Sequence, residues 1–155
     1  MSGSGKASVL KAFEDLDYYC VDNLPIDLIP RFADLAKQSA EIEKAALVAD
    51  VREGEQLKRL PAIIHSLKKQ LKTTVVFLEA SDDALQRRFS ETRRPHPLGK
   101  ESTVKNALKK ERRLLQPIRT MADMVVDTSV VLVFKPALDI TAEALAAYNK
   151  AYPAK

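Results

Sequence analysis

The sequence has little of several residue types that define particular classes of protein. Its one cysteine, Cys20, cannot form an internal disulfide or a cysteine metal site, which favours a reducing compartment. Only four of the 155 residues are glycine and 46% are hydrophobic, so the composition excludes a fibrous or disordered chain. No run of about 18 apolar residues is present for a membrane span. These absences predict a cytoplasmic globular protein with a buried core.

The formal charge of +4 is unevenly distributed along the chain. Residues 87–119, here called the basic region, contain eleven Lys or Arg and three Glu, so the remaining residues are net negative. A basic region of this kind suits a phosphate-rich partner such as RNA, although a solvated helix face can have the same composition.

Short apolar runs alternate with amphipathic stretches, the pattern of a parallel sheet flanked by helices. We predict strands at 18–21, 45–49, 73–78 and 124–126. We predict helices at 6–16, 25–37, 55–72, 82–89, 105–120 and 141–148. Pro61 should kink or break the third of these helices. The aromatic residues Tyr18, Tyr19 and Phe77 lie in strand-like runs and are predicted to be core residues.

The first seven residues resemble the end of a phosphate-binding loop. Met1-Ser2-Gly3-Ser4-Gly5-Lys6-Ala7 matches the last part of GxxxxGK[ST], with a helix directly after it. Glycines let several backbone N–H groups converge on one point, the helix N-terminus favours an anion, and the lysine adds a mobile positive charge. A flexible Gly/Ser terminus with a solvated lysine is the alternative. The pattern favours a nucleotide phosphate site.

Acidic residues stand where predicted strands end, which is where α/β proteins bind their ligands. They are Asp22, Asp50, Glu79 and Asp127. Asp22 and Glu79 are candidate Mg²⁺ ligands, with a turn or a helix cap as the alternative for each. Asp50 with Arg52 could contact a base, ribose or phosphate, or could form a surface turn.

Four segments, taken in order, carry a resemblance to a known family. They are SGSGKASVLKAFEDLDYYCVDNLP, ADVRE, VVFLEASDDALQRRFSETRRPHPL and ERRLLQPIRTMADMVVDTS. Together they resemble the amino-terminal domain of the RapZ family of bacterial P-loop nucleotide-binding proteins, also described as RNase adapter proteins. The resemblance implies an α/β, P-loop NTPase-like three-layer fold with a mostly parallel sheet.

The same resemblance implies a purine nucleotide, ATP or GTP, with Mg²⁺. The ATP-phosphate loop then comprises Ser2, Gly3, Ser4, Gly5, Lys6 and Ala7, and the segment assigned to GTP comprises Asp50, Val51, Arg52 and Glu53. For the modest hydrolysis of this family, Lys6 is expected to neutralise phosphate charge, Asp22 to hold Mg²⁺ or orient water, and Arg93 to stabilise the transferring group.

Three departures from the family pattern shape our expectations. The first glycine of the loop and its strand are missing, so the sheet is expected to lack its first strand. Ala7 replaces the hydroxyl residue that binds magnesium, so we expect weak or impaired ATPase or GTPase activity. The resemblance covers residues 1–129, the predicted nucleotide-binding domain, and leaves 130–155 as a divergent, partly helical tail. We therefore expect a fragment or shortened gene product.

Two other functions stay open on the sequence alone. The first is an RNA-binding adapter that uses the basic region, and the second is a truncated product without a competent site. The family's amino-sugar and RNA functions are associated with a carboxyl-terminal domain that has no counterpart here.

Overall fold

The computed structural model describes residues 1–93, 95–99 and 103–129. The strands are β1 (Tyr19–Val21), β2 (Ala45–Leu47), β3 (Val76–Glu79) and β4 (Met124–Asp127). The α-helices are α1 (Lys6–Glu14), α2 (Ile29–Gln38), α3 (Leu60–Lys68), α4 (Asp82–Thr92) and α5 (Val104–Met121). Two 3-10 segments, η1 (Ile26–Leu28) and η2 (Val51–Arg59), complete the described elements. The helix predicted at 141–148 lies outside the described residues.

The strands are parallel, as predicted, but they form two small sheets. β1 pairs with β2 from Tyr19 opposite Ala45, and β3 pairs with β4 from Val76 opposite Met124. The expectation of one larger sheet is therefore not met among the described residues, since β2 and β3 do not pair. Parallel strands with helical connections nevertheless confirm the predicted α/β class.

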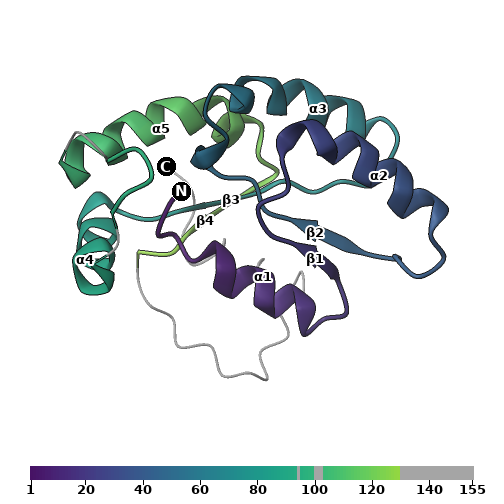
Figure 1. The fold of residues 1–155 in the computed structure, drawn as a ribbon, viewed down its shortest axis with the longest axis horizontal. Helices are drawn as coiled ribbons and strands as arrows, with labels where there is room; N and C mark the ends of the chain where they lie inside the picture. The colour runs from purple at the N-terminus through teal and green to yellow at the C-terminus, as the bar shows by residue number, and fades with distance from the viewer. Residues whose placement is uncertain (94, 100–102, 130–155) are drawn as a thin grey trace.

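Helices cover both sides of the strands (Figure 1). α2, α3 and α5 lie along one side, α1 lies on the other, and α4 lies near the ends of β3 and β4. The amino terminus lies among the strands, where the Met1 amine donates a hydrogen bond to the Leu78 carbonyl of β3 at 2.7 Å. This contact places the glycine-rich residues beside the carboxyl end of β3.

Proline and glycine set two boundaries that the sequence pattern placed differently. The single helix predicted at 55–72 is a 3-10 segment, η2, followed by α3, with Pro61 in the first turn of α3. Gly54 interrupts η2 with a φ of 57° and a ψ of −125°. Pro117 is accommodated inside α5. The apolar periodicity identified the buried face but not the type of helix.

The core lies between the strands, α3, α4 and α5. Its largest fully buried side chains are Ile26, Leu85, Leu108, Glu111, Val51 and Ser4. Two polar side chains in that group are unusual because burial of a polar atom costs free energy unless it is hydrogen-bonded. Ser4 belongs to the glycine-rich residues and Glu111 hydrogen-bonds Ser2 beside it, so the fully buried polar side chains are concentrated at that part of the fold.

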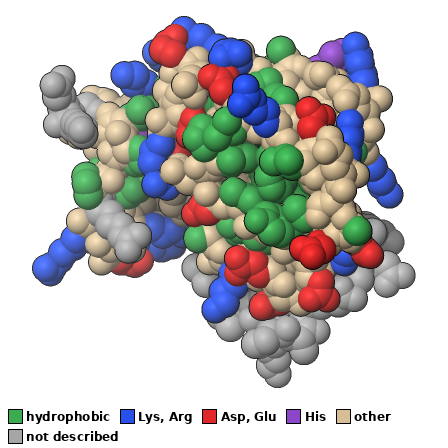
Figure 2. Space-filling view, turned by 45° about the vertical axis from the view of Figure 1, so that its right-hand side comes forward, with side chains coloured by type: hydrophobic (Ala, Val, Ile, Leu, Met, Phe, Trp, Pro, Cys, Tyr) green, Lys and Arg blue, Asp and Glu red, His purple; other side chains and the backbone are tan. Residues whose placement is uncertain are grey.

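One predicted core aromatic lies at the surface instead. Phe77 is buried, but Tyr19 is 52% exposed, with its ring 5.8 Å from that of Phe32 on α2. Leu35 of α2 is also exposed. Figure 2 turns toward the viewer the side of the molecule that carries α2, and it shows hydrophobic side chains gathered there with acidic side chains around them.

Within the part of the chain that the structure describes, no helix combines the length and the hydropathy needed to cross a membrane.

Candidate functional site

The glycine-rich residues form a tight turn that leads directly into α1. Gly3 and Gly5 have φ values of 77° and 87°, in the left-handed region that favours glycine. Met1, Ser2 and Ser4 are buried, whereas Gly3, Gly5 and Ala7 are exposed. The first helical bond of α1 joins Val9 N to Gly5 O at 3.1 Å. The amides of the residues between them precede that bond and lack intrahelical acceptors, so they can hold an anion.

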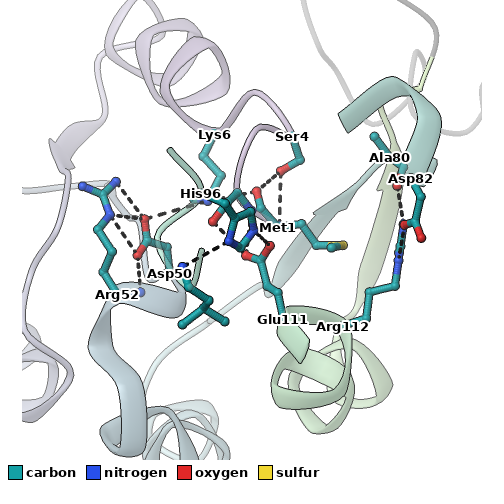
Figure 3. Close-up of polar contacts among 12 residues, drawn as sticks. Met1, Ser4, Lys6, Asp50, Arg52, Ala80, Asp82, His96, Glu111 and Arg112 are labelled. Carbon is teal, nitrogen blue, oxygen red and sulfur yellow. Dashed lines mark hydrogen bonds and ion pairs between the residues drawn. The ribbon is translucent and has the colours of Figure 1, made fainter. Parts of the chain in front are cut away.

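Lys6 lies in the first turn of α1 and folds back over the glycine turn. Its Nζ donates to Met1 O at 3.0 Å and lies 4.0 Å from Asp50 Oδ2, with only 20% of the side chain exposed (Figure 3). Burial lowers the pKa of the Lys6 ammonium below its ordinary value, and the Asp50 carboxylate partly opposes that effect. A desolvated cation at a helix N-terminus is suited to an anionic ligand.

Side chains from three other parts of the fold hold the turn in place. Glu111 of α5 accepts from Ser2 N and Ser2 Oγ at 2.7 and 2.9 Å. Arg88 of α4 donates to Gly3 O at 3.0 Å and to the Thr128 carbonyl. Thr128, after β4, has its Oγ1 3.1 Å from Ser4 O. The turn is therefore braced from α4, α5 and the end of β4.

The segment from Asp50 to Glu53 lies next to this turn, and its side chains have distinct contacts. Asp50 caps η2 by accepting from Arg52 N at 2.8 Å, and it also pairs with the Arg52 guanidinium at 2.9 Å. Val51 is a core residue, 1% exposed. Glu53 accepts from Ile26 N at 3.4 Å. Only Asp50 of the four faces Lys6, so the structure brings the two predicted nucleotide segments together through that contact.

The two predicted Mg²⁺ ligands lie in different surroundings. Asp22 is exposed after β1, and its charge opposes the lowering of the Lys6 pKa by burial, as the charge of Asp50 does. Glu79 does not cap α4, because Ser81 does so, and its carboxylate instead accepts from Arg119 at 2.8 and 2.9 Å.

The described residues offer few of the ligands that a Mg²⁺ ion needs. Ala7 has no hydroxyl, the Glu79 oxygens are engaged by Arg119, and no three His, Cys, Asp or Glu side chains gather into a metal site among the described residues. The metal roles of Asp22 and Glu79 stay predictions, and we assign no step to the metal.

The basic region divides into engaged and solvated side chains. Arg88 contacts the turn, Arg112 pairs with Asp82 at 2.7 Å, and Arg119 pairs with Glu79. Arg93 is exposed at the C-cap of α4, with a φ of 50°, and its catalytic role stays a prediction. Lys109 on α5 is also exposed. Position within the basic region therefore does not by itself indicate a contact with the site.

Three residues at the site were not proposed from the sequence. They are His96, Glu111 and Thr128. His96, which the sequence showed only as an isolated residue between two prolines, is 2% exposed and lies 3.0 Å from Glu111. Glu111 had a visible signal, because it interrupts the apolar stripe of α5 between Leu108 and Leu115.

The parallel α/β fold, with a glycine turn that opens a helix and a lysine in that helix's first turn, defines a P-loop-like protein. Comparison with known families agrees with this class. The family model described as the RapZ-like N-terminal domain matches residues 1–146. The chain belongs to this family, as its four motif segments predicted.

Several bacterial relatives are similar to most of this chain. A nucleotide-binding protein of Koribacter versatilis is 65% identical over 129 residues, which is 83% of this chain and 42% of that protein. Nucleotide-binding proteins of Acidobacterium capsulatum and Myxococcus xanthus are 60% and 48% identical, each over 83% of this chain and over 42% and 45% of their own lengths. The chain thus spans less than half the length of these relatives.

Proposed function

We propose that this protein binds a purine nucleotide, ATP or GTP, through phosphate contacts at the glycine turn. The observation that carries the proposal is the turn itself, in which two left-handed glycines lead into α1 above a mostly buried Lys6. The names of the relatives, which are nucleotide-binding proteins, support the same reading.

The proposed mechanism is electrostatic. The free amides at the start of α1 and the Lys6 ammonium would share the charge of the phosphates, in a place where low exposure strengthens each contact. A phosphate would replace Met1 O and Asp50 as the partner of Lys6 Nζ, which lies 3.0 Å from the first and 4.0 Å from the second. Binding therefore requires the Lys6 side chain to turn outward.

The direct test is calorimetric titration of the protein with ATP, GTP and CTP. Lys6→Ala should weaken binding about ten- to hundredfold, because a charge-assisted contact contributes about 1.5–3 kcal/mol. Lys11→Ala is the matched control, since Lys11 is an exposed lysine on the same helix. Equal affinity of the parent and Lys6→Ala, or loss in Lys11→Ala alone, would contradict the proposal. CTP as tight as ATP and GTP would remove the purine preference.

We propose that hydrolysis is weak at most, because Ala7 offers no hydroxyl at the position that binds magnesium in the full motif. Ala7→Ser restores that hydroxyl on an exposed side chain. Phosphate release in the presence of Mg²⁺ should increase at least several-fold in Ala7→Ser. An unchanged rate would indicate that another missing group limits hydrolysis.

RNA binding is a second candidate, supported by one observation on α5. Lys105, Lys109 and Arg113 are exposed and recur every four residues, so they lie along one face of the helix. RNA affinity that falls steeply with salt, and that falls in a Lys105→Ala/Lys109→Ala double variant, would support this function. Salt-insensitive or absent RNA binding would exclude it.

A further inference from the structure

We propose that Glu111 is a positioning residue for the glycine turn, acting with His96 from behind the turn. This inference rests on the proposed function, because it concerns how the turn is held ready for phosphate. Glu111 and His96 are 0% and 2% exposed, and Ser2 is 6% exposed. All three residues are therefore buried, and their hydrogen bonds lie inside the protein instead of at its surface.

The Glu111 carboxylate divides its two oxygens between two segments of the chain. Oε1 accepts from the Ser2 amide at 2.7 Å and from the Ser2 hydroxyl at 2.9 Å. Oε2 lies 3.0 Å from His96 Nε2 (Figure 3). One side chain of α5 thereby connects the glycine turn to the segment that follows α4.

The hydrogen bonds fix the protonation of the neutral ring. Leu98 N donates to His96 Nδ1 at 3.1 Å, so Nδ1 is the acceptor and Nε2 carries the proton. Nε2 then donates to Glu111 Oε2, and the carboxylate receives three donors without offering one. Among the described residues, no buried side-chain nitrogen or oxygen lacks a partner. A side chain that accepts at two oxygens and donates at neither satisfies all three donors, which few polar residues could do.

The cost of burying a carboxylate argues for a role beyond filling space. Glu111 lies on the apolar face of α5 between Leu108 and Leu115, where a hydrophobic residue would pack without any loss of hydration. A hydrophobic residue at this position would leave the two Ser2 donors and the His96 donor without an acceptor. The carboxylate is therefore explained by what it holds.

Aromatic rings also pack beside His96 and the glycine turn. The His96 ring lies 5.0 Å from that of Phe89, and a Cβ added to Gly3 would meet Phe89 at 3.4 Å. With Ser2 fixed by Glu111 and the Gly3 carbonyl fixed by Arg88, the backbone on one side of the turn is held. Because a preorganised turn loses less conformational entropy when it binds phosphate, it binds phosphate more tightly.

The test compares Glu111→Gln with Leu108→Ala in the full chain. Glu111→Gln keeps the size of the side chain but replaces one carboxylate oxygen with an amide NH₂ group. That group is a donor, so it cannot accept from the Ser2 or His96 donor that it faces. Leu108→Ala is the matched control, because it truncates a fully buried residue of the same helix whose side chain has no hydrogen-bonding group to offer the turn. At a temperature where both variants are folded, Glu111→Gln should bind ATP at least tenfold more weakly than the parent. Leu108→Ala should bind within twofold of the parent.

A second readout separates positioning from general stability. Amide hydrogen exchange without nucleotide should accelerate at residues 2–5, at His96 and at Leu98 in Glu111→Gln, and it should accelerate throughout the core in Leu108→Ala. If Glu111→Gln does not fold, Ser2→Ala removes one of the three donors and should give a smaller, local acceleration at the turn. Nitrogen chemical shifts should show His96 with the proton on Nε2 in the parent.

The outcomes distinguish this inference from the proposed function. Parent-like ATP affinity in Glu111→Gln, with exchange raised evenly across the core, would overturn the positioning role while leaving nucleotide binding in place. If the parent binds no nucleotide, the proposed function fails, and the exchange pattern alone then decides whether Glu111 positions the turn.

Discussion

Glu111 of α5 and Glu79 at the end of β3 offer a comparison between an enclosed and an accessible carboxylate. Glu111 has no exposed side-chain surface and accepts from Ser2 and His96, whereas Glu79 is 17% exposed and accepts from Arg119. Ion pairs that water reaches contribute about 0–1 kcal/mol, but removing one partner of a buried charged contact costs several times more. Loss of the enclosed glutamate, which is the one that contacts the glycine turn, is therefore expected to cost more stability than loss of the accessible one.

The largest expected effect is the loss of the enclosed carboxylate. Glu111→Ala leaves the Ser2 and His96 donors buried without an acceptor, so the free energy of unfolding should fall by about 3–5 kcal/mol. Urea unfolding followed by circular dichroism measures this change. A loss of less than about 1 kcal/mol would place Glu111 in the same class as an exposed pair.

An intermediate effect is expected for the backbone of the turn itself. Gly5→Ala forces an alanine to a φ of 87° and should cost about 1 kcal/mol of stability, although no atom within 4 Å obstructs the new Cβ. Gly54→Ala is the matched control, with a φ of 57° and equally open surroundings in η2. Both variants should unfold at lower urea concentrations, Gly54→Ala at the lowest because its ψ of −125° lies outside the left-handed helical region, but ATP affinity should fall only in Gly5→Ala.

The smallest effect is expected at the accessible carboxylate and depends on pH. The hydrogen bond from Arg119 lowers the pKa of Glu79 below its ordinary value of 4.5. Because the folded-state pKa is the lower one, the stabilisation is complete above pH 4.5 and is lost as the pH falls through the folded-state value. Urea midpoints measured from pH 6 to pH 3 should therefore fall less steeply in Arg119→Ala than in the parent. Parallel curves for the two proteins would show that the pair contributes no pH dependence.

Much of the fold could be predicted because its signals are local. The glycine turn, the helix after it and the strand at 124–126 follow from neighbouring residues, and the structure has β4 at Met124–Asp127. The division of the strands into two sheets depends on which edges meet, and no local pattern encodes that. Gly54 interrupts η2 with a kink, and the apolar periodicity does not reveal its conformation.

The site was predictable only on its ligand-facing side. Lys6 and Asp50 stand out by residue type and position after a turn or a strand, and the structure places them 4.0 Å apart. The bracing contacts join residues as far apart as Ser2 and Glu111, and a single sequence carries no sign of such pairs beyond a charged residue in an apolar stripe. His96 gains its role entirely from that tertiary contact.

The amide spectrum of the nitrogen-labelled protein during titration with ATP tests phosphate binding at the glycine turn most directly. Binding at the glycine turn should produce its largest chemical-shift changes at the amides of Gly3, Gly5, Lys6 and Ala7, and Lys6→Ala should reduce them at the same ATP concentration. Saturable changes centred elsewhere, for example on the cavity of about 350 Å³ that Glu79, Arg112 and Arg119 help to line, would contradict the assignment of the phosphate site. An unchanged spectrum at millimolar ATP would contradict nucleotide binding itself.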